Sequence, residues 1–198
     1  MSARDRLSAY RGKRDFARTP EPSGRARTAK ERPRFVIHKH DASRLHYDFR
    51  LEVAGVLASW AVPKGPSTDP REKRLAVRTE DHPLDYARFE GVIPRGEYGA
   101  GTVMVWDRGT YRNLRDEKRR MSESVKDGLV EVWLRGKKLR GGYALKRIAR
   151  GSKPRWLLIK MDDDEADARR NPVSSEPKSA KSGKTLRQIA RRSKGSPP

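Results

Sequence analysis

The sequence has no cysteine among its 198 residues, and this absence excludes several kinds of chemistry. Disulfide bonds, cysteine-ligated zinc ribbons and cysteine nucleophiles cannot form. No run approaches the roughly 18 apolar residues that a transmembrane helix needs, and the first residues lack the apolar segment of a secretory signal. We therefore expect a soluble protein of the reducing cytoplasm, with no membrane contact.

Several sequence fingerprints of phosphate and nucleophile sites are also absent. The glycine-rich segment 91–101 has neither the Gly-Lys-Ser/Thr ending of a P-loop nor the strand and helix that flank a dinucleotide site. No Gly-x-Ser-x-Gly elbow is present. A wide turn is the favoured interpretation of 91–101, and a water molecule activated by a metal ion is the favoured nucleophile for any hydrolysis.

Hydrophobic residues are scarce, at 34%, while the formal net charge is +21. The charge is concentrated at the ends. Residues 1–34 hold 11 basic and 4 acidic side chains, and residues 168–198 hold 9 and 1. Strongly basic arms on a globular domain of lower charge density are typical of nucleic-acid-binding proteins. The alternative is that the arms only keep the protein soluble.

The central region shows the pattern of a mainly β domain, which we place at 35–161. Short runs broken by turn residues predict strands at 34–39, 45–53, 56–62, 74–79, 101–107, 129–134, 138–147 and 155–161. A helix is expected at about 115–127, starting near Asp116 and closed by Gly128. Many short strands with little helix predict a compact antiparallel β-barrel with one or two short helices.

The two ends are expected to be flexible basic arms. We interpret 1–34 as a mostly irregular arm laid over the barrel. The acidic run 162–165 is expected to end the fold, so that 162–198 forms a disordered basic tail.

Strict alternation marks the segment 45–53. Its odd positions are apolar, and its even positions hold His46, Asp48, Arg50 and Glu52. A strand places the two sets on opposite faces, so His46 and Asp48 can chelate one ion, and His40 can return over a turn as a third ligand. Such ligands suit a divalent transition metal, and the arginine suits an anionic substrate. An ordinary polar strand face is the alternative.

The remaining histidine outside this cluster, His82, lies between Glu80 and Tyr86. A lone histidine is often structural. Because the other three histidines are already clustered at 38–46, we expect His82 to join the same pocket and to bind, or donate a proton to, a phosphate oxygen.

These segments together resemble the 3′-phosphoesterase domain of bacterial DNA ligase D. The similarity runs from about residue 10 to residue 160 and is densest at 39–42, 45–52, 59–66, 80–86 and 98–101. It implies a β-barrel with a groove on one face. It also implies a manganese-dependent enzyme that trims 3′ ends of DNA or of primer strands, removing a terminal ribonucleoside and then the 3′-phosphate to leave a 3′-OH.

The resemblance also implies roles for single residues. His40, His46 and Asp48 match the metal ligands, for Mn²⁺ or a replacement such as Co²⁺ or Zn²⁺. Arg50 and His82 match phosphate contacts that stabilise the transition state, with Tyr86 nearby. Further matches to positions implicated in activity are Lys64, Arg74, Glu80, Arg14, Asp15 and Glu21. His38 stands where relatives often carry glutamine, as a same-face neighbour or an alternative ligand.

The partners expected from this resemblance are DNA or RNA–DNA 3′ ends, including primer–templates. A separate DNA ligase, polymerase or Ku-type end-binding protein is expected beside them, with the protein a monomer associated with the nucleoid. One alternative is a non-catalytic nucleic-acid-binding module that recruits a separate end-joining ligase. It does not explain why His46 and Asp48 share a face beside Arg50. The other alternative, a metal-dependent hydrolase of small phosphorylated molecules, is disfavoured by the basic arms.

Overall fold

The structure is a computed structural model that describes residues 3–24, 32–115 and 119–194. Its strands are β1 (Arg34–Asp41), β2 (Leu45–Val53), β3 (Val56–Val62), β4 (Lys73–Arg78), β5 (His82–Pro83), β6 (Gly91–Ile93), β7 (Gly101–Asn113), β8 (Leu129–Gly136), β9 (Arg140–Ala149) and β10 (Arg155–Lys160). The strands predicted at 45–53 and 56–62 have these bounds, whereas β5 and β6 were not predicted.

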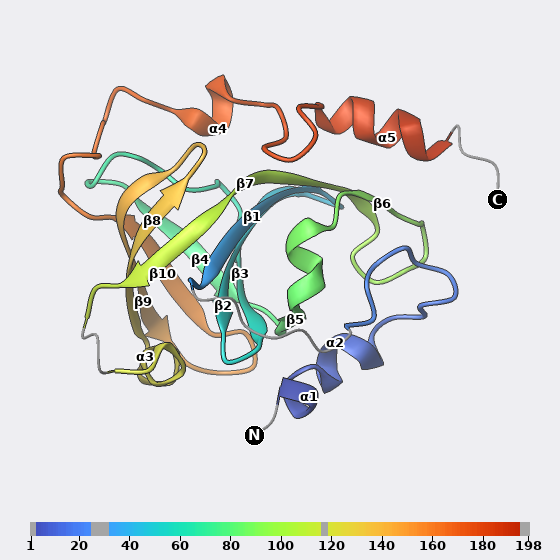
Figure 1. The fold of residues 1–198 in the computed structure, drawn as a ribbon, viewed down its shortest axis with the longest axis horizontal. Helices are drawn as coiled ribbons and strands as arrows, with labels where there is room; N and C mark the ends of the chain where they lie inside the picture. Colours follow the sequence, from blue (N-terminus) through green and yellow to red (C-terminus); the bar gives the residue numbers. More distant parts are fainter. Residues whose placement is uncertain (1–2, 25–31, 116–118, 195–198) are drawn as a thin grey trace.

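The strands form a closed barrel (Figure 1). Neighbours around it are β1, β2, β3, β4, β10, β9, β8 and β7, and β7 pairs again with β1, so eight strands close the ring. All pairs are antiparallel; β5 is added to β3 and β6 to β7. The predicted antiparallel β-barrel is therefore confirmed.

Short helices complete the fold of the described residues. They are α1 (Ala3–Arg6), α2 (Ser8–Gly12), the 3₁₀ helix η1 (Leu84–Arg88), α3 (Met121–Asp127), α4 (Pro172–Ser175) and α5 (Leu186–Lys194). The helix predicted at 115–127 corresponds to α3. Its predicted start, Asp116, lies outside the described residues, and Gly128 ends it at φ +92° as expected. None of these helices is long and apolar enough to cross a membrane.

Two hydrophobic clusters lie on either side of the barrel wall. Odd residues of β2, such as Tyr47 and Phe49, belong to the barrel interior together with Trp60. The outer face of the same wall carries a second cluster, built on Val36 and Leu57 and covered by α2 and η1. The even residues of β2 therefore point outward, as the alternation predicts, but they meet a covering layer rather than solvent.

The described part of the N-terminal arm, residues 3–24, is packed rather than flexible. Tyr10 of α2 is fully buried in the outer cluster, and its hydroxyl donates a hydrogen bond to Pro22 O at 2.8 Å. This buried aromatic side chain and the ion pair between Arg6 and Asp81 hold the segment against the barrel. This arm forms the cover over the outer faces of β1 and β2.

The C-terminal segment also differs from expectation, because 162–194 packs onto the barrel instead of forming a disordered tail. It lies across the barrel, orange to red in Figure 1, and α5 runs beside β6 and β7. Ile189 is buried in the interior cluster, and Val173 and Leu186 pack against the same cluster. Trp106 Nε1 donates to Glu176 O at 2.8 Å. A few well-spaced apolar side chains anchor a segment whose overall composition suggested disorder.

The acidic run 162–165 belongs to the fold and does not end it. Asp163 accepts hydrogen bonds from Gly142 N at 2.7 Å and from Lys160 Nζ at 2.6 Å. A Cβ at Gly141, whose φ is +86°, would lie 2.6 Å from Asp163 Oδ1. Glycine is therefore needed at this position of β9 because the acidic run approaches the strand closely.

Candidate metal and phosphate site

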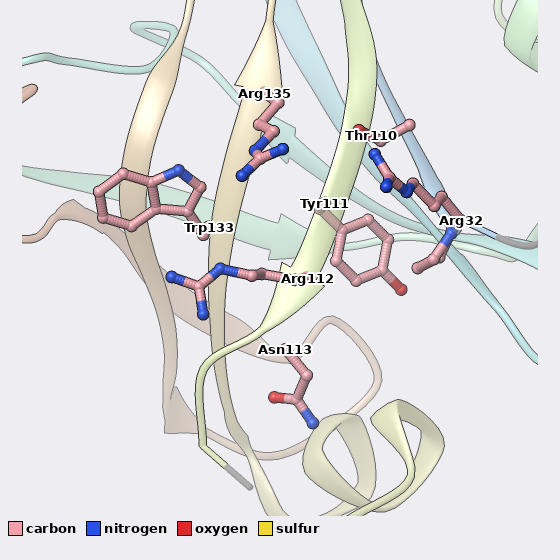
Figure 2. A pocket seen from close by; sticks show the side chains of 8 residues that line it. Arg32, Thr110, Tyr111, Arg112, Asn113, Trp133 and Arg135 are labelled. Carbon is pink, nitrogen blue, oxygen red and sulfur yellow. The ribbon is translucent and has the colours of Figure 1, made fainter. Parts of the chain in front are cut away.

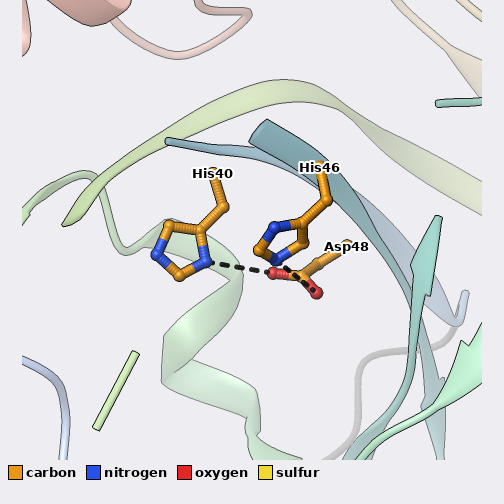
Figure 3. A group of neighbouring side chains, drawn as sticks. All are labelled: His40, His46 and Asp48. Carbon is orange, nitrogen blue, oxygen red and sulfur yellow. Dashed lines mark ion pairs between the residues drawn. The ribbon is translucent and has the colours of Figure 1, made fainter. Parts of the chain in front are cut away.

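Three side chains on β1 and β2 form a cluster of possible metal ligands, His40, His46 and Asp48. His40 and His46 lie opposite each other in the β1–β2 pair, and Asp48 follows two residues later on the same face. One ligand atom from each lies within 4.8 Å of the others. His40 Nδ1 and His46 Nε2 are each 3.7 Å from the Asp48 carboxylate (Figure 3). The cross-strand register thus brings together the three residues that the sequence singled out.

Backbone carbonyls orient both imidazole rings of this cluster. His46 Nδ1 lies 2.9 Å from Arg44 O, and His40 Nε2 lies 2.9 Å from Gly99 O. A carbonyl oxygen only accepts hydrogen bonds, so each of these nitrogens carries the proton. The other nitrogen of each ring faces Asp48, and in a neutral ring it offers a lone pair to a cation. Metal-binding histidines are typically held in this way, and the donor set fits a divalent transition metal.

Arg50 lies behind the cluster and is 3% exposed. Its Nη2 is 3.0 Å from Asp48 Oδ2, its Nη1 donates to Ser59 Oγ at 2.8 Å, and its Nε donates to His38 Nδ1 at 3.3 Å. Burial and the Arg50 guanidinium lower the pKa of His38 to about 3, which keeps the ring neutral. His38 therefore serves as an acceptor that orients Arg50, and it stands outside the three-residue cluster.

The Asp48 carboxylate is ionised despite its burial. Burial by itself would raise its pKa, but Arg50 and the two neighbouring histidines bring that pKa below its usual value. A buried carboxylate that stays charged can bind a cation over a wide pH range.

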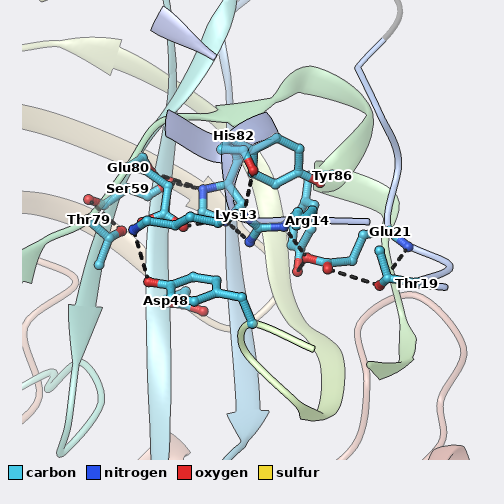
Figure 4. A network of polar contacts seen from close by, with 12 residues as sticks. Lys13, Arg14, Thr19, Glu21, Asp48, Ser59, Thr79, Glu80, His82 and Tyr86 are labelled. Atoms are coloured by element: carbon cyan, nitrogen blue, oxygen red, sulfur yellow. Dashed lines mark hydrogen bonds and ion pairs between the residues drawn. The ribbon is translucent and has the colours of Figure 1, made fainter. Parts of the chain in front are cut away.

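His82 extends the site from β5. Its Nδ1 lies 3.0 Å from Glu80 O, and its Nε2 lies 3.5 Å from Arg14 Nη2. Burial, followed by the charges of Arg50 and Arg14, lowers its pKa well below the usual value. The ring is therefore neutral, with Nδ1 donating to the carbonyl and Nε2 facing the Arg14 guanidinium (Figure 4).

The N-terminal arm contributes Arg14 and the buried carboxylate of Glu21. Arg14 Nε donates to Glu21 Oε1 at 2.9 Å, and Tyr86 OH donates to the same oxygen at 3.0 Å. Thr19 Oγ1 donates to Glu21 Oε2 at 3.0 Å. Glu80 Oε1 lies 3.5 Å from Arg14 Nη1. Glu21 thus fixes the positions of Arg14 and Tyr86 from beneath the site.

A cavity of about 240 Å³ unites most of the predicted residues. It is lined by Arg14, His40, His46, Asp48, Arg50, Glu80, His82 and Tyr86. Two arginines and a cluster of possible metal ligands around one cavity form a suitable environment for a phosphoryl group.

Three predicted residues lie elsewhere. Asp15 is exposed, and its Oδ1 accepts a hydrogen bond from Ala17 N within a turn. Lys64 and Arg74 line a different pocket, between the end of β3 and β4. The structure does not bring these three side chains to the cavity, and their roles stay predictions.

Other residues at the site were not predicted from the sequence. Ser59 accepts from Arg50 and lies 3.5 Å from His82 Nδ1. Tyr98 lines the cavity and its hydroxyl accepts from Lys13 Nζ at 3.2 Å. The sequence feature that could have indicated Tyr98 is the glycine-rich segment 91–101, for which a wide turn was the favoured interpretation. Gly99, in the same segment, supplies the carbonyl that orients His40.

The chain is similar to proteins of known class. The family profile described as "DNA Ligase D 3'-phosphoesterase domain" matches residues 38–147, more than half of the chain. The "Multifunctional non-homologous end joining protein LigD" of Pseudomonas aeruginosa is 51% identical over 185 residues, which cover 91% of this chain and 22% of that protein. The corresponding DNA repair protein of Mycobacterium tuberculosis is 46% identical over 162 residues, or 81% of this chain and 20% of that protein. The chain thus spans about a fifth of the length of these relatives, and it belongs to the DNA ligase D 3′-phosphoesterase domain family.

Proposed function

We propose that this chain is a metal-dependent phosphoesterase that processes the 3′ ends of nucleic-acid strands. It removes 3′-terminal ribonucleosides as a phosphodiesterase and 3′-phosphates as a phosphomonoesterase, leaving a 3′-OH. The observation that carries the proposal is the pair of imidazole rings, each with one nitrogen donating to a backbone carbonyl and the other facing Asp48. Within this family, that arrangement supports His40, His46 and Asp48 as the ligands of Mn²⁺, with Co²⁺ or Zn²⁺ as possible replacements.

A divalent cation bound there supplies Lewis acidity toward a phosphoryl oxygen and lowers the pKa of water. The protein's own residues do the rest. Arg50 and Arg14 are held rigidly by Asp48, Ser59 and Glu21, so both guanidinium groups are already in place to balance negative charge on the phosphoryl oxygens.

His82 is neutral in the free protein because burial and two arginines lower its pKa. A phosphate group in the cavity adds negative charge beside the ring and opposes that effect. Substrate binding therefore favours the protonated ring, which can donate a hydrogen bond from Nε2 to a phosphoryl oxygen or give up a proton to it. Tyr86, held by Glu21, borders the same space.

The nucleic-acid substrate follows from the family and from the charge. The net charge of +21 favours a polyanion over a small phosphorylated molecule. The relatives bear the name of end-joining proteins, so we propose DNA or RNA–DNA 3′ ends as substrates and a DNA ligase, polymerase or Ku-type end-binding protein as partners.

The test is hydrolysis of a primer–template with one 3′-terminal ribonucleotide, using protein stripped of metal by a chelator and then supplied with Mn²⁺. We expect turnover in the wild type with Mn²⁺ and very little in His46→Ala. The matched control, Glu123→Ala, changes a partly exposed carboxylate of α3 far from the cavity and should leave the rate unchanged. Equal rates in wild type and His46→Ala would refute the proposal, and tight binding without turnover would favour the non-catalytic binding module.

A further inference from the structure

A second pocket lies on the outer wall of the barrel, near the end of β1 that is remote from His40. Its volume is about 440 Å³. It is lined by three arginines and two aromatic residues, together with smaller side chains; the five are Arg32, Arg112, Arg135, Tyr111 and Trp133. In Figure 2 the Arg112 and Arg135 guanidinium groups lie on either side of a space bordered by the Trp133 ring. None of the site residues discussed above lines this pocket.

The strand register explains why these side chains converge. Arg112 of β7 lies directly opposite Trp133 of β8, and Thr110 lies opposite Arg135. The alternate residues of β8 are buried in the barrel, so Trp133 and Arg135 point outward. The Arg112 guanidinium lies 5.5 Å from the Trp133 ring centroid, a cation–π contact that keeps both side chains in place.

The charge in this pocket is positive and unbalanced. Within the described part of the chain, no carboxylate lines the pocket, and neither Arg112 nor Arg135 is in an ion pair. The neighbouring Arg34 differs, because its Nε is 2.7 Å from Glu52 Oε2. An arginine stacked on a tryptophan is common on protein surfaces, but several arginines around one hollow with an aromatic wall resemble the sites that hold a phosphate and stack a base.

The pocket and the candidate active site share one wall. Arg34, beside the pocket, lies on the same face of β1 as His40, because it pairs with Glu52, which shares its face of β2 with Asp48. The six residues from His40 to Arg34 span about 20 Å of strand. Val36, between them, is buried beneath α2 and η1, so a strand that joins the two sites passes around this layer and covers more than that distance. At the ~3.4 Å spacing of a strand in a duplex, this path needs more than about six nucleotides.

We propose that this pocket binds an unpaired nucleotide, with its base stacked on Trp133 and its phosphate held by Arg112 and Arg135. The nucleotide lies more than about six positions from the 3′ end that occupies the His40–Asp48 cavity. This assignment rests on the proposed function for the position of the 3′ end. The pocket increases the affinity for strands that are long enough to reach it, and it does not contact the reacting bond.

The first test is binding of single-stranded DNA with a 3′-OH, in lengths of about three and about ten nucleotides, followed by anisotropy of a labelled strand. The wild type should bind the longer strand far more tightly. Trp133→Ala should remove most of this gain, a loss of roughly five- to a hundredfold for the longer strand, while binding of the shorter strand is unchanged. Trp133→Phe keeps an aromatic ring and should retain most of the gain. Lys153→Ala, an exposed cation in the β9–β10 loop, is the matched control.

Intrinsic fluorescence gives a readout that does not depend on turnover. Three of the four tryptophans, Trp60, Trp106 and Trp156, are at most 1% exposed, so a base that stacks on the protein surface reaches Trp133 alone. The longer strand should quench the wild type and leave Trp133→Phe unquenched, although that variant still binds. Arg135→Ala should lower the salt dependence of binding by about one counterion.

The outcomes separate this pocket from the proposed function. The longer strand could bind more tightly through Trp133 although the protein hydrolyses no 3′ end. That result would support nucleotide binding in the pocket and refute the phosphoesterase activity. Two results would overturn the proposed nucleotide binding in the pocket. One is a protein that hydrolyses 3′ ends and whose affinity depends on strand length in Trp133→Ala as in the wild type; the other is quenching that persists in Trp133→Phe.

Discussion

Arg50 Nη2 lies 3.0 Å from Asp48 Oδ2, so a proposed phosphate contact and a proposed metal ligand form one buried ion pair. The pair links the two halves of the site. Arg50 neutralises Asp48 when no cation is bound, and it presents positive charge to the cavity that Asp48 borders. The same geometry makes the stability of the protein sensitive to both groups.

Arg50→Met should leave the Asp48 charge buried without its partner and lower the free energy of unfolding by about 3 kcal/mol. Mn²⁺ should restore part of this loss, because a cation at His40, His46 and Asp48 compensates the same carboxylate. Urea denaturation with and without Mn²⁺ measures both effects. The matched control is Arg34→Met, which breaks the Arg34–Glu52 pair on the same wall. Mn²⁺ should not restore the unfolding free energy that Arg34→Met loses. Equal restoration by Mn²⁺ in both variants would contradict a metal site at Asp48.

Glu21 is expected to act as a positioning residue. Its Oε1 accepts from both Arg14 Nε and Tyr86 OH. Glu21→Gln keeps an oxygen there but removes the charge that holds Arg14, so we expect kcat to fall about tenfold with little change in KM. Mn²⁺ affinity should stay as in the wild type, since no ligand is altered. Thr19→Val loses the donor to Oε2 and the acceptor for Glu21 N but keeps the Glu21 charge, so it should have a smaller effect on kcat; a larger one would argue against this role.

The free energy of unfolding should depend on pH because of His82. Its pKa is lowered in the folded protein by burial, Arg50 and Arg14. Below the unfolded value of about 6.5 the unfolded chain binds a proton that the folded ring does not, so stability falls as pH falls, by up to roughly 1.4 kcal/mol per pH unit. His82→Asn has no group at this position that binds a proton in the unfolded chain. The difference in unfolding free energy between the two metal-free proteins should therefore shrink from pH 7 to pH 5, and a constant difference would exclude a neutral, buried His82.

The C-terminal segment should contribute to stability through α5. Ile189→Ala removes a buried side chain that packs against the barrel and should cost about 3 kcal/mol of unfolding free energy. Arg187→Ala, on the exposed face of the same helix, should change it by less than about 0.5 kcal/mol. Chemical denaturation compares the two. Equal, small effects would mean that the segment does not pack as described.

Local patterns predicted much of the barrel and the centre of the site. The alternation in 45–53 and the turn at Ala54 and Gly55, with φ values of 49° and 82°, are short-range signals, and they placed β2, β3 and the outward face of Asp48 correctly. His40 and His46 meet because a short turn joins β1 to β2. Sequence spacing is enough to predict such neighbours.

Long-range packing explains what the sequence did not predict. The alternation in β2 predicted a polar outer face, and only the resemblance pointed to the N-terminal arm there. Tyr10 and Glu21, from a distant part of the chain, cover this face, which no local pattern indicates. Ile189 anchors a segment whose composition suggested disorder. Lys64 and Arg74 were expected at the site but line another pocket, and no local pattern reveals where a loop after β3 points.

The most direct test of the central claim is the rate of phosphate release from a 3′-phosphorylated primer–template as a function of Mn²⁺ concentration. We expect saturation with Mn²⁺ in the wild type. In Asp48→Asn, which keeps the position in β2 but removes the charge, we expect the rate to fall by at least about a hundredfold at any Mn²⁺ concentration. Release that is independent of Mn²⁺, or that saturates alike in both proteins, would contradict the central claim.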